Sequence, residues 1–300
     1  MSDTLVALSP IFVGLSLGVI LRRVGVAGLT EASTLLKIIF YVISPAVSFS
    51  ATSDVEITKH LLLFPVFAFI SVVAGYFTGK FFASRINIDG VKKTVFVLAC
   101  LIVNSFVSLA FLSAQYGTDG AARAILFDFV NAPMIYGVAY AIAVKGNPSV
   151  HLQTSVIKKV LLGPPIWGIV LGILVNIMDI DVPKVVDQTV KTFSLPFVPI
   201  LMIAIGLSIV IKKKDVMPSF IAAGVRLVTG ITIATAFVLL LDLNGIDRAA
   251  VLTLGVAPVG FNTVTFASLE NLDVEFAAET LSVSVLIGVV ASSAVILLTT

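Results

Sequence analysis

Long runs without a single charged residue recur along the whole of this 300-residue chain. A hydrocarbon core about 30 Å thick is crossed by roughly 20 helical residues, which is close to the length of most of these runs. A β-barrel would instead require alternating segments of about ten residues, whereas these runs are continuously apolar. We therefore expect an all-α integral membrane protein. Ten transmembrane helices are predicted, at residues 4–21, 38–53, 60–79, 94–118, 129–144, 160–178, 192–211, 227–241, 249–269 and 280–300.

Composition excludes the other broad protein classes. Hydrophobic residues make up 58% of the chain and charged residues 12%, where soluble domains have about 25% charged residues. So many apolar side chains cannot all be buried inside one water-facing globule, so the chain is neither soluble, disordered nor fibrous. The net charge of +2 gives no indication of a nucleic-acid partner. The shorter runs reach crossing length if Lys37, Asp128 and Arg226 lie inside helices.

Basic residues are divided unequally between alternate loops. Thirteen of the 19 lie in the loops after the first, third, fifth and seventh spans, and five lie on the opposite side. Because cytoplasmic loops carry the excess of Lys and Arg, both termini are expected outside a bacterial-type cytoplasmic membrane. The run from Lys212 to Lys214 is one of these topology signals and would also meet anionic lipid.

An internal repeat relates the two halves of the chain. The first and sixth spans share prolines and glycines at one spacing, so two five-helix halves are predicted at 1–150 and 151–300, joined through the polar stretch 145–153. Because each half has an odd number of helices, the second half enters the membrane from the face opposite to the one where the first half enters. Inverted repeats of this kind are typical of secondary transporters, whose substrate sites lie near the midplane between interrupted helices. The positions matched at an offset of 154 are Pro10 and Pro164, Gly14 and Gly168, Gly18 and Gly172, and Pro45 and Pro199.

Two asparagines, Asn104 and Asn262, lie at membrane depth and are related by a similar offset, 158 residues. Pro258 removes a backbone donor just before Asn262, so the ninth span is expected to be broken there. A half-helix N-terminus with an amide beside it suits a carboxylate, although each asparagine could instead hydrogen-bond a neighbouring helix. The predicted substrate-binding residues are Asn104, Ser105, Ser108, Pro258, Asn262 and Thr263.

Asp128 and Asn131 share one face of the fifth span, and Arg226 lies at comparable depth in the eighth. Either Asp128 takes up a proton or sodium ion that drives transport, or it forms a structural ion pair with Arg226. Lys37 is expected to extend toward the lipid headgroups. The loops contain no metal-ligand spacing, phosphate-binding loop or nucleophile triad, so neither an enzyme, a bound metal nor a cofactor is predicted.

Several segments resemble the auxin efflux carrier family of membrane transporters, and the resemblance covers nearly the whole chain. It implies ten helices, a homodimer, and a scaffold of helices 1, 2, 6 and 7. It also implies that the remaining helices form a transport unit for small organic anions, with the substrate bound where helices 4 and 9 cross. The fourth span departs from the family in having Ser108 and Ala110 where a glycine and a proline are usual, so whether it is broken stays open. The similar segments are residues 18–25, 36–46, 127–131, 200–207 and 257–267.

These observations predict a secondary transporter of mono- or dicarboxylates in the lipid bilayer, working by alternating access of the elevator type. The rival within transport is a sodium-coupled symporter of the bile-acid type, which should gather acidic and amide groups at the crossover. The sequence indicates no acidic residue near the asparagine pair. An intramembrane enzyme would need two facing aspartates, and a channel accounts less well for inverted repeats with broken helices.

Overall fold

The computed structural model describes residues 2–55, 59–146, 163–210 and 216–300, and in these ranges the regular structure is helical apart from one isolated β-bridge, with short loops between the helices. The expected all-α class is therefore confirmed. The polar join predicted at 145–153 lies mostly outside the described residues, as does the lysine run at 212–214. The first half contains α1 (Ser2–Arg23), α2 (Leu29–Ile38), η1 (Ile39–Ile43), α3 (Ser44–Ser53), η2 (Lys59–Leu62), α4 (Leu63–Ala83), α5 (Gly90–Leu101), α6 (Ser105–Met134), η3 (Ile135–Ala139) and α7 (Tyr140–Gly146). The second half contains α9 (Pro164–Ile177), α10 (Lys184–Ser194), α11 (Phe197–Ser208), α12 (Val216–Leu240), α13 (Gly245–Gly255), α14 (Asn262–Leu269) and α15 (Val274–Thr299).

Within the described ranges, seven helical segments are long and apolar enough to cross a membrane. The difference from ten arises partly because α5, α13 and α14 are each shorter than one crossing. In addition, 105–146 forms one continuous segment of 42 residues, although Gly117 within it has a non-helical φ of 58°. The helix α9 is a shorter apolar helix. A multi-pass helical protein is therefore established, while the tenfold crossing and the inverted repeat stay predictions.

Two helix pairs meet at glycines that leave no room for a side chain. In the α1 and α11 pair, a Cβ at Gly18 would collide with the carbonyl of Ile203. In the α3 and α9 pair, a Cβ at Gly168 would collide with the carbonyl of Pro45. A Cβ at Gly14 would likewise lie 3.1 Å from the carbonyl oxygen of Pro199. The contact of Gly14 with Pro199 therefore corresponds, at the offset of 154 residues, to that of Gly168 with Pro45.

Two helices are broken, and the breaks pair with each other. The first lies between α5 and α6, and the second, predicted just before Asn262, lies between α13 and α14. At the crossing, Asn104 N–H donates to the Pro258 carbonyl at 2.9 Å and Gly260 N–H donates to the Ile102 carbonyl at 2.8 Å. An antiparallel bridge joins the residues between them, Val103 and Val259. Two N–H groups and two carbonyls released by the breaks thus satisfy each other across the crossing, and the Val259 N–H donates to the Ser284 hydroxyl of α15 at 2.9 Å, as the interior of a membrane protein requires. The break in the ninth span is confirmed, and the fourth is broken as well.

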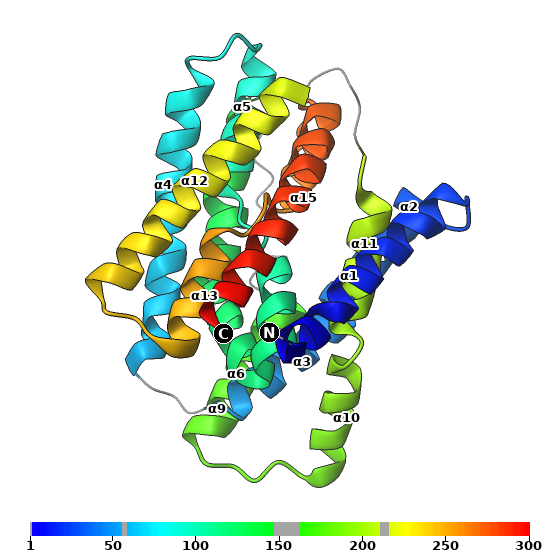
Figure 1. The fold of residues 1–300 in the computed structure, drawn as a ribbon, viewed down its shortest axis with the longest axis vertical. Coiled ribbons are helices and arrows are strands. Elements are labelled where there is room, and N and C mark those ends of the chain that lie inside the picture. Colours follow the sequence, from blue (N-terminus) through cyan, green and yellow to red (C-terminus); the bar gives the residue numbers. More distant parts are fainter. Residues whose placement is uncertain (1, 56–58, 147–162, 211–215) are drawn as a thin grey trace.

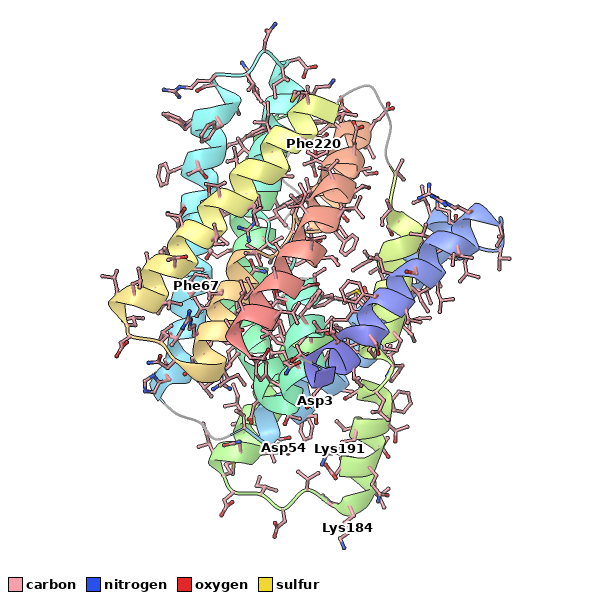
Figure 2. All side chains as sticks on the ribbon, in the orientation of Figure 1. Asp3, Asp54, Phe67, Lys184, Lys191 and Phe220 are labelled. Carbon is pink, nitrogen blue, oxygen red and sulfur yellow. The ribbon has the colours of Figure 1, made fainter. Side chains whose placement is uncertain are left out.

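Both ends of the described chain lie on the same side of the molecule. The hydroxyl oxygens of Thr4 and Thr300 are 3.3 Å apart, and Figure 1 shows the two termini close together, remote from the connection between α4 and α5. Figure 2 shows charged side chains at the end of the molecule where the termini lie, including Asp54, Lys184 and Lys191. Large apolar side chains such as Leu298, which is 83% exposed, lie on the outside of the helices. Such surfaces fit lipid rather than water as the solvent.

Candidate functional site

A cavity of about 490 Å³ lies beside the crossing of the broken helices. Its walls come from α2 and η1 on one side and from the two breaks, α6 and η3 on the other. The structure brings five of the predicted polar residues to this cavity, although they are far apart in sequence. They are Asn104, Ser105, Asp128, Asn131 and Asn262.

The two asparagines stand at the starts of half-helices. Asn104 precedes α6 and Asn262 is the first residue of α14, and neither helix has a side-chain cap bond. The Asn104 amide nitrogen lies 3.5 Å from the Val259 carbonyl oxygen, a long contact within the crossing. Helix N-termini carry a partial positive charge, so both half-helices present that charge at the cavity. This end of the crossing is therefore suited electrostatically to an anion.

Asp128 is the acidic residue of the cavity. Its carboxylate accepts hydrogen bonds from the Ser105 hydroxyl at 2.6 Å and from the Asn131 amide at 2.9 Å. The Asn131 side chain is fully buried, and its Oδ1 has no hydrogen-bond partner within the described ranges. Asp128 thus lies near the asparagine pair, contrary to the sequence interpretation that placed no acidic residue there. The fifth span brings it back to the crossover because the chain folds back after Gly117.

The ion pair expected between Asp128 and Arg226 is not formed in the part of the chain that the structure describes. Arg226 is 2% exposed on α12, and its guanidinium lies against Gly230, next to the carbonyl of Gly255. Gly255 ends α13, so the cation stands at a half-helix C-terminus, where the dipole favours it. Asp128 instead stands beside Ser105, at the N-terminus of α6. Each charge therefore complements a helix end, which explains why the two do not pair.

Three of the predicted substrate-binding residues do not line the cavity. The Ser108 hydroxyl donates to the Thr253 carbonyl at 3.0 Å and joins α6 to α13. Thr263 is fully buried within α14. The Pro258 carbonyl accepts the N–H of Asn104. A substrate contact of these three residues therefore stays a prediction, since none of them belongs to the cavity wall.

Sequence reasoning missed several residues of the cavity wall. Lys37 lies at the end of α2 and Tyr41 four residues further on in η1, and both line the cavity. Tyr136 is hydrogen-bonded to the side chain of Asn262. Tyr41 belongs to the π-helical segment η1 and Tyr136 to the π-helical segment η3. Such single-turn π-helices occur frequently at functional sites. Tyrosines inside otherwise apolar runs were the available signal.

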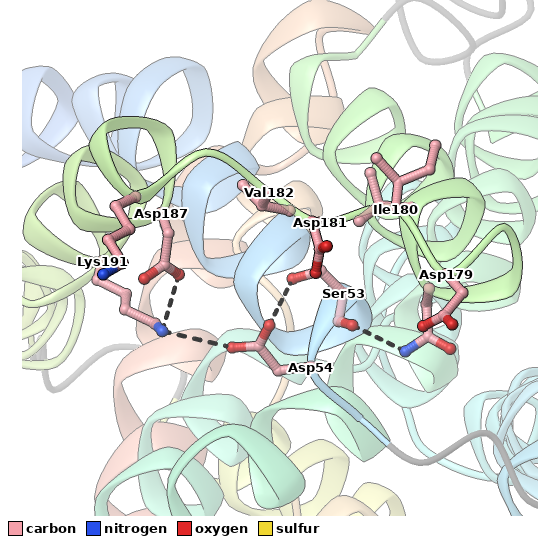
Figure 3. Close-up of a pocket in the computed structure, with 11 residues that line it drawn as sticks. Ser53, Asp54, Asp179, Ile180, Asp181, Val182, Asp187 and Lys191 are labelled. Carbon is pink, nitrogen blue, oxygen red and sulfur yellow. Dashed lines mark hydrogen bonds and ion pairs between the residues drawn. The ribbon is translucent and has the colours of Figure 1, made fainter.

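A second hollow, of about 390 Å³, lies between the end of α3 and the start of α10. Figure 3 shows Lys191 between Asp187 and Asp54, with both carboxylates directed at its ammonium. The Lys191 ammonium lies 2.7 Å from Asp187 and 3.8 Å from Asp54, while the Asn176 amide donates to the Ser53 carbonyl at 2.8 Å. These groups bind each other at an exposed surface, so this hollow is a structural contact and the crossover cavity is the candidate site.

Comparison with known proteins identifies the same kind of protein. The family model described as membrane transport protein, which is auxin efflux carrier-like, matches residues 3–296. An uncharacterized transporter of Methanothermobacter thermautotrophicus is 24% identical over 281 residues, 91% of each chain. An uncharacterized transporter of Methanocaldococcus jannaschii is 25% identical over 272 residues, 85% of each chain. With broken, crossing helices and a family match from end to end, the chain belongs to the auxin efflux carrier-like family of membrane transport proteins.

Proposed function

We propose that this protein is a secondary active transporter of small organic anions, mono- or dicarboxylates, that works by alternating access of the elevator type. The observation that carries the proposal is the cavity at the crossing of two broken helices, with Asn104 and Asn262 in its wall. Irregular backbone at membrane depth is tolerated where it lines a cavity, and transporters place their substrates at such interruptions.

The chemistry of the cavity favours a carboxylate. The amides of Asn104 and Asn262 each offer two N–H donors, which a carboxylate can accept. The two half-helix N-termini add a partial positive charge without adding a titratable group. A hydrogen bond to a charged acceptor contributes about twice as much as one between neutral groups. A small anion can therefore exchange its hydration shell for these donors.

The helix packing supports two units that move relative to each other. The scaffold of this proposal comprises α1, α2 to α3, α9, and α10 to α11, and the transport unit comprises α4 to α7 and α12 to α15. Contacts related by the offset of 154 residues in the two glycine-packed helix pairs favour the halves 1–150 and 151–300 as inverted repeats. The nearness of Thr4 to Thr300 favours an even number of crossings. A homodimer in the cytoplasmic membrane, with both termini outside, completes the proposal.

A cation-coupled symporter is the second candidate, and one observation favours it. Asp128 brings a carboxylate into the same cavity as the asparagine pair, beside the unpartnered buried Oδ1 of Asn131 in the described structure. Oxygen atoms of carboxylates and amides are suitable ligands for hard cations. In this version of the mechanism, Asp128 and Asn131 bind a proton or a sodium ion that travels with the anion.

The test begins with the wild-type protein in detergent and a panel of acetate, benzoate, malonate and succinate. A ligand that binds only the folded state raises the apparent stability, by about 2.7 kcal/mol at a concentration of 100 Kd. The panel member that stabilises the protein is then used, radiolabelled, for counterflow in liposomes. We expect Asn104→Ala and Asn262→Ala to reduce counterflow at least about tenfold, because each removes a donor to a charged group.

Gln188→Ala is the matched control, since it removes an exposed amide from α10 at a distance from the cavity. It should transport like the wild type. If no carboxylate stabilises the wild-type protein, the substrate class is wrong. If both asparagine variants transport normally, the site is wrong.

A further inference from the structure

Lys37 has an unusual position for a lysine of a membrane helix. Its side chain is exposed, and it lines the same cavity as Asn104 and Asn262. Among the described residues of this wall, Lys37 is the only cation and Asp128 the only carboxylate. Neither an ion pair nor a hydrogen bond holds the Lys37 ammonium within the described ranges. A cation that faces the cavity without a protein partner is available to a ligand.

The placement of Lys37 follows from the helix that carries it. Ser33, Lys37 and Tyr41 are spaced four residues apart and all three line the cavity, so they form one face along α2 and η1. Residues at this spacing lie above one another on a helix surface. The two asparagines approach from the opposite wall, at the starts of α6 and α14. A ligand in the cavity would therefore meet amides on one side and a cation on the other.

The two asparagines carry no formal charge that could pair with the charge of an anion. An amide N–H donates to a carboxylate oxygen and to a carboxamide oxygen alike, so Asn104 and Asn262 favour an acid over its amide only through the stronger bond to a charged acceptor. Asp128 in the same cavity would repel an anion unless its charge is offset. A lysine that shares the cavity supplies the missing attraction, as a point charge on a flexible stem.

We propose that Lys37 is the charge-selecting residue of the substrate site, with its ammonium contacting the carboxylate that the two asparagines hydrogen-bond. This inference rests on the proposed function and adds to it a specific contact from the α2 side of the cavity. The contact makes the site prefer an ionised carboxylate over a neutral analogue of the same shape. A lysine that only reached the headgroups would have no such effect on ligand choice.

The experiment measures apparent Kd by thermal shift with purified full-length protein. The probes are acetate, benzoate, malonate and succinate, together with acetamide, benzamide, malonamide and succinamide. Lys37→Met removes the charge and keeps the apolar stem, while Lys37→Arg keeps the charge. Lys145→Met is the matched control, because Lys145 is also exposed but does not line the cavity.

For the carboxylate that binds the wild type, we expect Lys37→Met to raise Kd about three- to tenfold, the range for a charge-assisted contact in a hydrated site. Lys37→Arg should stay within about twofold, as should Lys145→Met. The ratio of the carboxamide Kd to the carboxylate Kd should fall in Lys37→Met. An unchanged carboxylate Kd in Lys37→Met, or an equal loss for acid and amide, would overturn the assignment.

A second measurement covers the case in which Lys37→Met does not fold. In the wild type, the carboxylate Kd should rise as salt screens the contact, and Lys37→Gln should lose that dependence relative to Lys145→Met. A salt dependence that persists in Lys37→Gln contradicts the proposal. Failure of the proposed function is a distinct result, since then no carboxylate stabilises even the wild type.

Discussion

Two kinds of helix contact in this protein differ in what they bring together: one joins unbroken helices at glycines, and the other joins broken helices beside a cavity. Where α1 meets α11, Gly18 and Gly206 bring the backbones so close that a Cβ on either would overlap the other helix. Where the broken helices meet, the chain gives up helical hydrogen bonds and replaces them with two bonds across the crossing, at 2.9 and 2.8 Å. The first contact leaves no room for a side chain at these two glycines, whereas the second assembles amides, a hydroxyl and a carboxylate around a cavity.

The α1 and α11 contact and the crossing of the broken helices suit different roles. Close packing through small residues is a main source of helix association in lipid, where no hydrophobic effect holds helices together. Such an interface has one good arrangement, which suits a rigid frame. In the proposed mechanism the crossing moves together with its own helices, while α2 and η1, which form the other wall of the cavity, belong to the scaffold. Each region can be broken by a substitution that leaves the other region intact.

The largest effect is expected from Gly206→Val. The new side chain would overlap the Leu15 carbonyl and the Gly18 backbone, and neither can move aside without separating α1 from α11. Overpacking of a tight contact costs about 1–3 kcal/mol, and more when backbone must shift. The melting temperature of the purified protein in detergent should fall markedly. Gly224→Val is the control, because a Cβ there meets no atom within 4 Å. Equal stability of the two variants would contradict the rigid-frame interpretation.

The glycine-packed frame was the more predictable of the two regions. Its prolines and glycines recur at a fixed offset, and small residues in membrane helices have few other uses. The break before Asn262 was predictable too, because Pro258 has no backbone N–H to donate within a helix. The break before Asn104 was not, since Ser108 and Ala110 give no such signal. There Val103 pairs with Val259 in an isolated bridge, and a pairing between segments so far apart in the chain cannot be predicted from either segment alone.

The candidate site was predicted only in part, for a related reason. Asn104 and Asn262 stood out as polar residues in apolar runs, and they do line the cavity. Asp128 was expected to face Arg226 because the two lie at similar depth, but depth along a helix says nothing about which face is presented. Lys37 was expected at the headgroups for the same reason. Facing is set by the packing of neighbours, which the sequence alone does not fix.

An intermediate effect is expected from Asp128→Asn, which tests the polar region. The amide keeps an oxygen that accepts from Ser105 but loses the charge that would bind a proton or sodium ion. Uptake driven by an ion gradient should therefore fall at least about tenfold, while exchange of labelled for unlabelled substrate stays within about threefold. Both are measured in liposomes with imposed sodium and proton gradients.

Asp242→Asn provides the control for charge loss, since Asp242 is exposed and its φ of 49° is one that asparagine adopts readily. It should leave both activities unchanged. If Asp128→Asn still accumulates substrate against its gradient, Asp128 does not couple transport to an ion. Loss of exchange and driven uptake together would instead assign Asp128 to holding Ser105 and Asn131 in place.

The smallest effects concern ion pairs at two places, one half-buried and one exposed. Arg123 of α6 contacts Asp247 of α13 at 2.6 Å, with side chains 11% and 17% exposed, whereas Lys191 is 52% exposed where it meets Asp187 and Asp54. Asp247 also lies in the first turn of α13, where a negative charge is favoured. We expect Asp247→Asn to lower the unfolding free energy by about 1–2 kcal/mol, and Lys191→Gln to lower it by less, because water screens the exposed pair. Denaturant unfolding of both variants in one detergent measures the difference. A larger loss in Lys191→Gln would mean that the hollow between α3 and α10 contributes more to the frame than its exposure indicates.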